Sequence, residues 1–247
     1  MSSDLFKAKL GRSLIEIQQR FHQKSIAIAD SAMILVSSHL LSLDEDDLSD
    51  PELAKSFRSL ESNLTNAGMN IENHFAGMLL TSVVTEVETY LIDVTKILLL
   101  YYPHKIGNKP FKLKDALNKT RDELVLEAAE KHLQSLMHKS PKEYLKDLAE
   151  LMSINPRLVE ESWPYFVEAK ARRDLGVHNN WKVNPTYRRK VEQVGFSLSE
   201  TDGMFLFADN EYLLDTMNHC NRLVASIGDQ LQSQYSLHIQ VDSGDDS

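Results

Sequence analysis

Residues 79–98 read LLTSVVTEVETYLIDVTKIL, and this stretch decides the fold class. Its apolar side chains recur every three or four positions, which is the period of an α-helix with one face in a core. The same stretch carries Glu86, Glu88, Asp93 and Lys96, and four charges would be too costly at the depth of a bilayer. We therefore expect a long core helix over about residues 71–102 and no membrane span. The apolar stripe consists of Leu79, Leu80, Val83, Val84, Val87, Tyr90, Leu91, Val94, Ile97 and Leu98.

The rest of the 247-residue chain also favours helices, because it holds only 9 glycines and 7 prolines. One exception is expected near the C-terminus, where residues 196–198 and 204–207 flank Asp202-Gly203 in the pattern of a β-hairpin. The predicted fold class is all-α, a helical bundle with a small β-hairpin near the C-terminus. Further helices are expected over about residues 5–41, 51–66, 112–117 and 121–139, from residue 141, from about 156 to 179, from residue 185, and over 209–233.

Helix ends are signalled in several places. Ser140 and Glu143 flank a proline in the pattern of a capping box, with the proline at the first helical position. Asp50 is placed to cap a helix that begins at Pro51, and Gly68 is placed to end it. These signals predict helix boundaries near residues 50, 68 and 140.

Charge and composition limit the function classes. The net charge of −9 argues against broad, nonspecific binding to nucleic acid. Residues 168–190, however, contain seven basic and two acidic side chains, which fits a confined phosphate site or, alternatively, a solvated helix face. The single cysteine, Cys220, excludes an internal disulfide framework and favours an intracellular, cytoplasmic location. The start of the chain shows no secretory signal pattern, and the nine histidines lack the H-E-x-x-H spacing, so we expect no metal site.

The chemistry-bearing segment is residues 171–180, which read ARRDLGVHNN. Arg173 offers a fixed cation, Asp174 a carboxylate that can orient its neighbours, and His178 a group that titrates near neutral pH. These are the groups needed to cleave a phosphodiester without a metal. A structural reading uses the same residues: an ion pair between Arg173 and Asp174, and a histidine whose cation the end of a helix favours.

This segment resembles the R-x4-H signature of the HEPN superfamily, many of whose members are metal-independent ribonucleases. Residues 79–214 are similar in layout to its RiboL-PSP branch. The likeness rests on residues 87–91 (VETYL), the helix with Trp163, the Val177-His178-Asn179 continuation, Val183-Asn184 and Tyr187. Gly176 departs from the branched apolar residue expected there, and we expect it to loosen the motif helix by about 1 kcal/mol.

The resemblance implies a HEPN-like helical domain over residues 71–236. Residues 1–70 would be an N-terminal helical extension packed on that core, and residues 237–247 a disordered acidic tail. It also implies a bacterial toxin–antitoxin or antiphage role, with RNA as partner, an antitoxin or regulatory protein as a further partner, and no cofactor.

The expected roles follow from the chemistry. His178 would act as the general base on the RNA 2′-hydroxyl, Arg173 would hold the scissile phosphate, and Asp174 would orient one of them. The product would carry a 2′,3′-cyclic phosphate. Supporting or RNA-binding roles are expected for Asn179, Arg172, Lys182 and Glu88, although a solvated helix position is the alternative for Glu88. Trp163, Tyr165 and Phe166 stand at helical spacing, which is more typical of a core than of a base-stacking surface.

One helix does not easily aim Arg173 and His178 at a single point. Five residues correspond to a rotation of about 140° beyond a full turn and a rise of about 7.5 Å. Two copies of the motif helix facing each other across a two-fold axis would solve this, so we expect a homodimer. The alternative function is a noncatalytic HEPN-like helical module that binds RNA, nucleotide or a partner protein.

Overall fold

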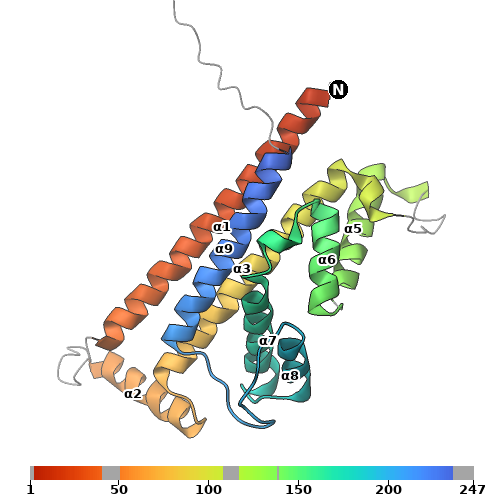
Figure 1. Cartoon of the computed structure of the whole chain (residues 1–247). Helices are drawn as coiled ribbons and strands as arrows, with labels where there is room; N and C mark the ends of the chain where they lie inside the picture. The colour runs from red at the N-terminus through yellow and green to blue at the C-terminus, as the bar shows by residue number, and fades with distance from the viewer. Residues whose placement is uncertain (1–2, 41–50, 108–116, 138, 236–247) are drawn as a thin grey trace, which may run out of the picture. The chain divides into compact units, whose positions relative to one another are not determined.

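The computed structural model describes residues 3–40, 51–107, 117–137 and 139–235. Within these ranges the chain is helical and contains no strand, which confirms the all-α class. Asp50, the helix expected over residues 112–117 (apart from residue 117 itself) and the acidic tail lie outside the described residues. The elements are α1 (Ser3–Leu40), α2 (Pro51–Asn66), α3 (Ile71–Tyr101), α5 (Arg121–Met137), α6 (Pro141–Met152), α7 (Trp163–Asn179), α8 (Pro185–Glu192) and α9 (Asn210–Tyr235), with short 3-10 turns at Pro103–Ile106 and Pro156–Leu158 (Figure 1).

The chain divides into two compact units. Unit 1 comprises Met1–Phe21, Thr89–Val159 and Val224–Ser247, and unit 2 comprises His22–Glu88 and Glu160–Leu223. The long helices α1, α3 and α9 therefore contribute residues to both. All the residues of the predicted site belong to unit 2. The expected boundary near residue 70, between an extension and a HEPN-like domain, stays a prediction.

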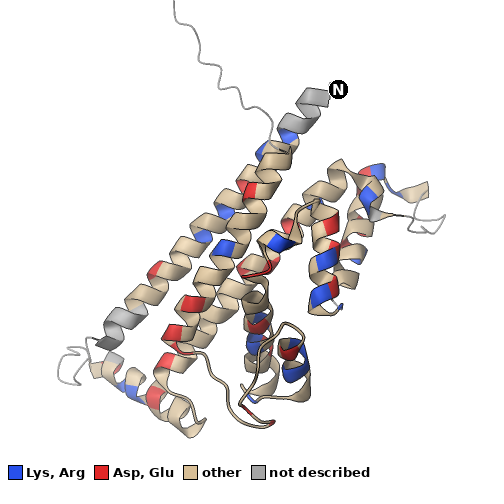
Figure 2. Cartoon of the chain, viewed as in Figure 1, with Lys and Arg blue, Asp and Glu red and all other residues tan. Residues whose placement is uncertain are grey.

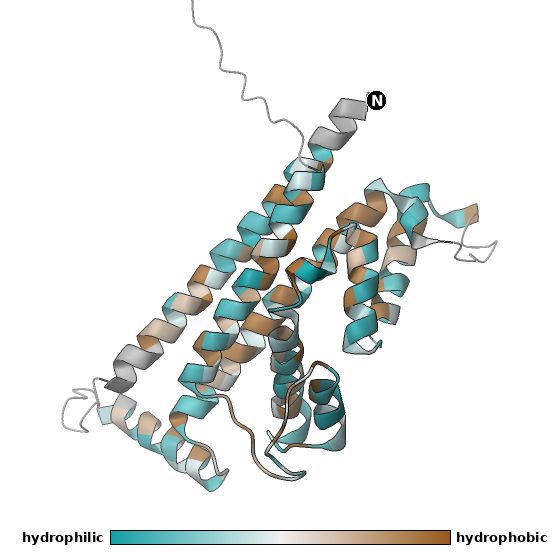
Figure 3. Ribbon diagram, in the orientation of Figure 1, coloured by the Kyte–Doolittle hydropathy of each residue, from teal (hydrophilic) through white to brown (hydrophobic). Residues whose placement is uncertain are grey.

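Helix α3 supplies core to each unit, as its sequence pattern predicted. Leu80, Val84 and Val87 are buried in unit 2, and Leu91 and Leu98 are buried in unit 1. Figure 3 shows the apolar colour running along this helix. Among the described helices α3 is the one long and apolar enough to cross a membrane, a test that a buried core helix also passes.

Each of the four charges within residues 79–98 of α3 has an opposite charge beside it. This pairing lowers the cost of placing ionised groups along a largely buried helix, because partnered charges lose less on leaving water. The pairs are Glu86 with Lys24 (2.8 Å), Glu88 with Lys170 and Arg173, Asp93 with Arg20, and Lys96 with Glu130 (3.6 Å).

The predicted boundaries of α6 and α2 are confirmed. The Ser140 hydroxyl accepts a hydrogen bond from the Glu143 backbone N–H, and the Glu143 carboxylate accepts one from the Ser140 N–H. Pro141 is the first residue of α6, and Pro51 the first of α2. Helix α2 ends at Asn66, and Gly68 follows it with φ +74.

The predicted β-hairpin is wrong. Residues 196–198 do not pair with residues 204–207; instead Phe205 forms an isolated antiparallel bridge with Lys182. The backbone N–H of Val183 donates to the Met204 carbonyl (2.9 Å), and the N–H of Leu206 donates to the Trp181 carbonyl (2.8 Å). The segment that the sequence assigned to a local hairpin thus covers the chain just after α7.

Candidate functional site

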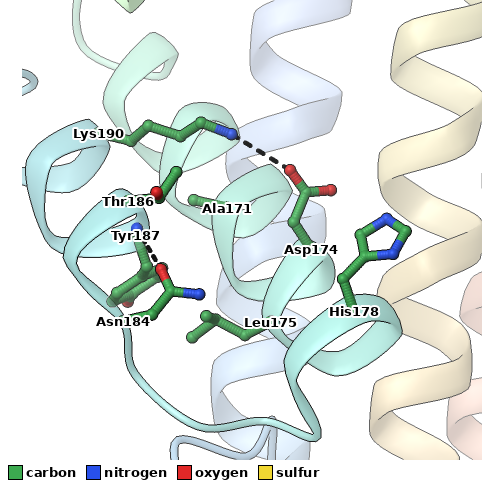
Figure 4. A pocket seen from close by; sticks show the side chains of 8 residues that line it. All are labelled: Ala171, Asp174, Leu175, His178, Asn184, Thr186, Tyr187 and Lys190. Carbon is green, nitrogen blue, oxygen red and sulfur yellow. Dashed lines mark hydrogen bonds and ion pairs between the residues drawn. The ribbon is translucent and has the colours of Figure 1, made fainter. Parts of the chain in front are cut away.

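The predicted motif lies on α7, and two of its three central residues meet at a pocket. Asp174 and His178 are one turn apart, so their side chains project from the same side of the helix. Both line a pocket of about 250 Å³ between α7 and α8, shown in Figure 4. The remaining lining residues are Ala171, Leu175, Asn184, Thr186, Tyr187 and Lys190.

Helix α8 begins with a side-chain cap and is held against α7 by packing. The Asn184 side chain accepts a hydrogen bond from the Tyr187 N–H (2.8 Å), which satisfies one of the donors left open at the start of the helix. A buried apolar cluster then joins the two helices, and it fixes the side of α8 that carries Lys190. The cluster consists of Ala171, Leu175, Val183, Tyr187 and Val191, with Phe196, Leu198 and Leu206 packed against it.

A chain of alternating charges connects the pocket to α3. Lys190 Nζ lies 3.3 Å from Asp174 Oδ2, and Arg173 Nε lies 3.0 Å from Asp174 Oδ1. The other end of the guanidinium, Nη2 of Arg173, lies 3.1 Å from Glu88 Oε2, and Lys170 pairs with the same carboxylate. Figure 2 shows basic and acidic positions interspersed along α7. Asp174 therefore bridges a cation in the pocket and a cation held by α3.

Arg173 does not line the pocket. Its side chain is 16% exposed, and its guanidinium forms ion pairs with two carboxylates. His178, in contrast, is exposed to solvent in the last turn of α7. The structure thus places His178, Asp174 and Lys190 on the wall of one pocket, and Arg173 is not among the residues that line it. The helical geometry of a five-residue spacing accounts for this divergence.

The end of α7 is fixed by a tryptophan wedged between two glycines. Asn180 and Trp181 both adopt the left-handed conformation, with φ 53 and φ 60, and so turn the indole back onto the helix that precedes it. A Cβ on Gly176 would lie 2.5 Å from Trp181 Cζ2, and a Cβ on Gly77 of α3 would lie equally close to that atom. The sequence predicted that Gly176 loosens the helix, but it did not predict that this glycine also has a packing role. Because Gly176 has no side chain, the indole of Trp181 can lie against α7 two residues from His178.

Arg172 is engaged in a buried network. Its guanidinium pairs with Glu168 (2.8 Å), stacks 3.7 Å over the Tyr212 ring and donates to the Phe207 carbonyl. Glu168 also accepts from the hydroxyls of Tyr187 and Tyr212, and burial together with this carboxylate raises the pKa of both phenols. Burial lowers the pKa of Arg172, but the negative partners around it outweigh that effect and raise it. Arg172 therefore stabilises unit 2. Its guanidinium is largely buried and paired, which does not support the predicted contact with RNA.

The two other predicted polar residues lie at the end of α7. The Asn179 side-chain amide donates to the carbonyl of Lys182, so it is occupied in holding the turn. The Lys182 ammonium lies 5.1 Å from the centre of the Phe205 ring and is exposed. Trp163 and Phe166 are buried, in agreement with their reading as core.

Sequence reasoning did not include Lys190 among the site residues. The basic run at residues 188–190 was the available signal, but only the packing of α8 shows which of its members lines the pocket. Of the seven basic side chains between residues 168 and 190, Lys182 and Arg189 alone have no carboxylate within 4 Å in the described part of the chain.

No family model, curated protein or solved structure matches this chain. Within the described ranges, no three histidine, cysteine, aspartate or glutamate side chains gather in a way that could hold a metal ion.

Proposed function

We propose that the protein is a metal-independent endoribonuclease of HEPN type. The observation that carries the proposal is the pocket lined by His178, Asp174 and Lys190, because it offers a potential general base and a cation on the wall of one cavity. The resemblance of residues 171–180 to the R-x4-H signature supports the assignment to RNA. We place the enzyme in the cytoplasm, in a toxin–antitoxin or antiphage role under the control of an antitoxin or regulatory protein.

The reaction needs one proton removed, one bond formed and one bond broken. His178 takes the proton of the ribose 2′-hydroxyl, the 2′-oxygen attacks the adjacent phosphorus, and the bond to the 5′-oxygen breaks. The 5′-oxygen leaves and takes a proton from water, and the other product ends in a 2′,3′-cyclic phosphate. Lys190 stabilises the negative charge that grows on the phosphate oxygens. DNA lacks the 2′-hydroxyl and is not cleaved.

Arg173 acts on this pocket through Asp174. Because Glu88 fixes one end of the guanidinium and Asp174 receives the other, Arg173 positions the carboxylate that holds Lys190. A second copy across a two-fold axis, with α7 at the axis, would add a second set of these groups to the cleft. We therefore keep the homodimer as part of the proposal.

The second candidate is a noncatalytic helical module that binds RNA, nucleotide or a partner protein. The observation in its favour is the double ion pair of Arg173, since a guanidinium held by two carboxylates is engaged in the fold. In that case His178→Ala would leave every activity of the protein unchanged.

The experiment is cleavage of labelled single-stranded RNA in excess EDTA, followed by analysis of the new ends. We expect wild-type protein to give cyclic-phosphate ends and His178→Ala to lose at least about 100-fold in rate, the usual range for losing a general base. His22→Ala, which removes another exposed helical histidine, is the matched control and should cleave normally.

The outcomes separate the candidates. No cleavage by wild type across several RNAs would move the assignment to the noncatalytic module. Equal cleavage by wild type and His178→Ala would place the chemistry elsewhere or in a contaminant. Poor growth of cells that express wild type, relieved by His178→Ala, would support the toxin role.

A further inference from the structure

An exposed aromatic ring lies beside the proposed site. Phe205 is 46% exposed although it is a large apolar side chain, and it stacks on Phe207, with the ring centres 5.2 Å apart and the planes 13° from parallel. Phe207 in turn contacts Trp181, whose indole fills the space between Gly77 and Gly176. The aromatic row therefore runs from an immobilised indole to a ring that is open to solvent.

The backbone under this ring is held firmly. Phe205 bridges Lys182, and the hydrogen bonds Val183 N–H to Met204 and Leu206 N–H to Trp181 lie on either side of the bridge. A ring held in one place loses little entropy when a ligand stacks on it. Such a ring is suited to be a platform for a flat ligand.

A cation without an acidic partner accompanies the ring. The Lys182 ammonium lies 5.1 Å over Phe205, and no carboxylate among the described residues lies within 4 Å of it. Its side chain is exposed, so the ammonium can move off the Phe205 ring and contact a phosphate instead. The backbone carbonyl of Lys182 accepts from Asn179, the neighbour of His178, which ties this position to the end of α7.

From these observations we infer that Phe205 and Lys182 form a subsite for single-stranded RNA. An unpaired base stacks on the Phe205 ring, and the phosphate next to it contacts the Lys182 ammonium. Aromatic rings and cations in alternation are the usual means of holding single strands, because every base has a π-face. A duplex keeps its bases stacked inside the helix and cannot offer one to the ring.

This inference rests on the proposed function for the identity of the polymer, but its test is separate. The probe is a fluorescent single-stranded RNA with 2′-O-methyl groups throughout, which cannot be cleaved by 2′-oxygen attack, compared with the same strand in a duplex. We expect wild type to bind the single strand more tightly than the duplex. Phe205→Ala should weaken binding of the single strand by about five- to 150-fold, the range for loss of one stacked base.

Two matched variants complete the design. Phe205→Tyr keeps a stacking ring and should bind within about twofold of wild type, because the π-face remains. Phe57→Ala removes a similarly exposed phenylalanine, 37% exposed on α2, and should leave binding unchanged. Thermal melts of all variants show whether a loss of binding reflects a loss of folding.

The result separates the inference from the proposed function. If wild type cleaves RNA but Phe205→Ala binds as well as Phe57→Ala, the subsite is overturned and the nuclease stands. If wild type does not cleave, yet binding of the single strand depends on Phe205, the subsite stands in a noncatalytic binder. If wild type prefers the duplex or binds neither, the subsite is overturned.

Discussion

At the scale of single residues, the least substitutable positions near the site are two glycines. Gly77 and Gly176 come from different helices, and Trp181 occupies the space that their side chains would fill. In a helix, glycine costs about 1 kcal/mol relative to alanine. Here packing outweighs helix propensity, because an added methyl would overlap the rigid indole, which also lies against the glycine of the other helix.

Gly176→Ala should therefore destabilise the protein by about 1–3 kcal/mol, the usual cost of overpacking. Urea denaturation of wild type and variant measures the difference. Gly228→Ala is the matched control in α9: the atoms nearest to its Cβ belong to the end of the flexible Gln18 side chain, which can rotate away, so we expect a smaller loss than for Gly176→Ala. Equal changes in the free energy of unfolding for the two variants would contradict the packing of Trp181 against Gly176.

The single cysteine should be inert in the folded protein. Cys220 is buried, and burial raises the pKa of its thiol to about 12. The folded state thus binds the thiol proton more tightly than the unfolded state, so the contribution of this group to stability falls as pH rises from about 8.5 towards 12. We expect no reaction with Ellman's reagent at pH 8 in buffer and full reaction in urea. Rapid labelling of the native protein would contradict this burial.

At the scale of elements, the start of α6 depends on its capping box. Hydrogen bonds from the Ser140 side chain and backbone lower the pKa of Glu143, so this carboxylate stabilises the cap above its ordinary pKa and loses that effect as pH falls through its lowered value. Ser140→Ala should cost about 1 kcal/mol at pH 7, as is usual for loss of an N-cap.

Thermal melts at pH 7 and at pH 3 check this prediction. The gap between wild type and Ser140→Ala should narrow at pH 3, because Glu143 is then closer to protonation in both proteins. Ser199→Ala, which changes an exposed serine outside any helix, serves as the control and should melt like wild type. A gap that widens at low pH would contradict the assignment.

The helices were predictable where the signals are local. The apolar period of α3, the box at Ser140 and the prolines that open α2 and α6 each act within one turn or one face. The pairing near the C-terminus was not predictable from local signals. Phe205 pairs with Lys182, which lies outside the segment that resembled a hairpin. Within the site, the placement of Asp174 and His178 on one side of α7 follows from helical spacing, whereas the contribution of Lys190 depends on how α8 packs against α7.

At the scale of the whole molecule, acidic side chains outnumber basic ones, and most basic side chains around the site already have partners. The chain carries a net charge of −9, and five of the seven basic side chains between residues 168 and 190 pair with carboxylates. Within this segment a polyanion can therefore gain few new contacts, those to Lys182, Arg189 and the pocket residue Lys190. This distribution favours a short, confined contact with RNA over binding along an extended strand.

The salt dependence of binding should report this small number of contacts. Each phosphate contact with a single strand contributes about −0.7 to the slope of log K against log salt, so three contacts predict a slope near −2. Titrations of the 2′-O-methyl single strand at several KCl concentrations measure it. Lys182→Ala should bring the slope about 0.7 closer to zero, whereas Lys142→Ala, which removes an exposed lysine of α6, should not change it. A wild-type slope steeper than about −4 would mean that many more cations reach the phosphates than the ion pairs leave available.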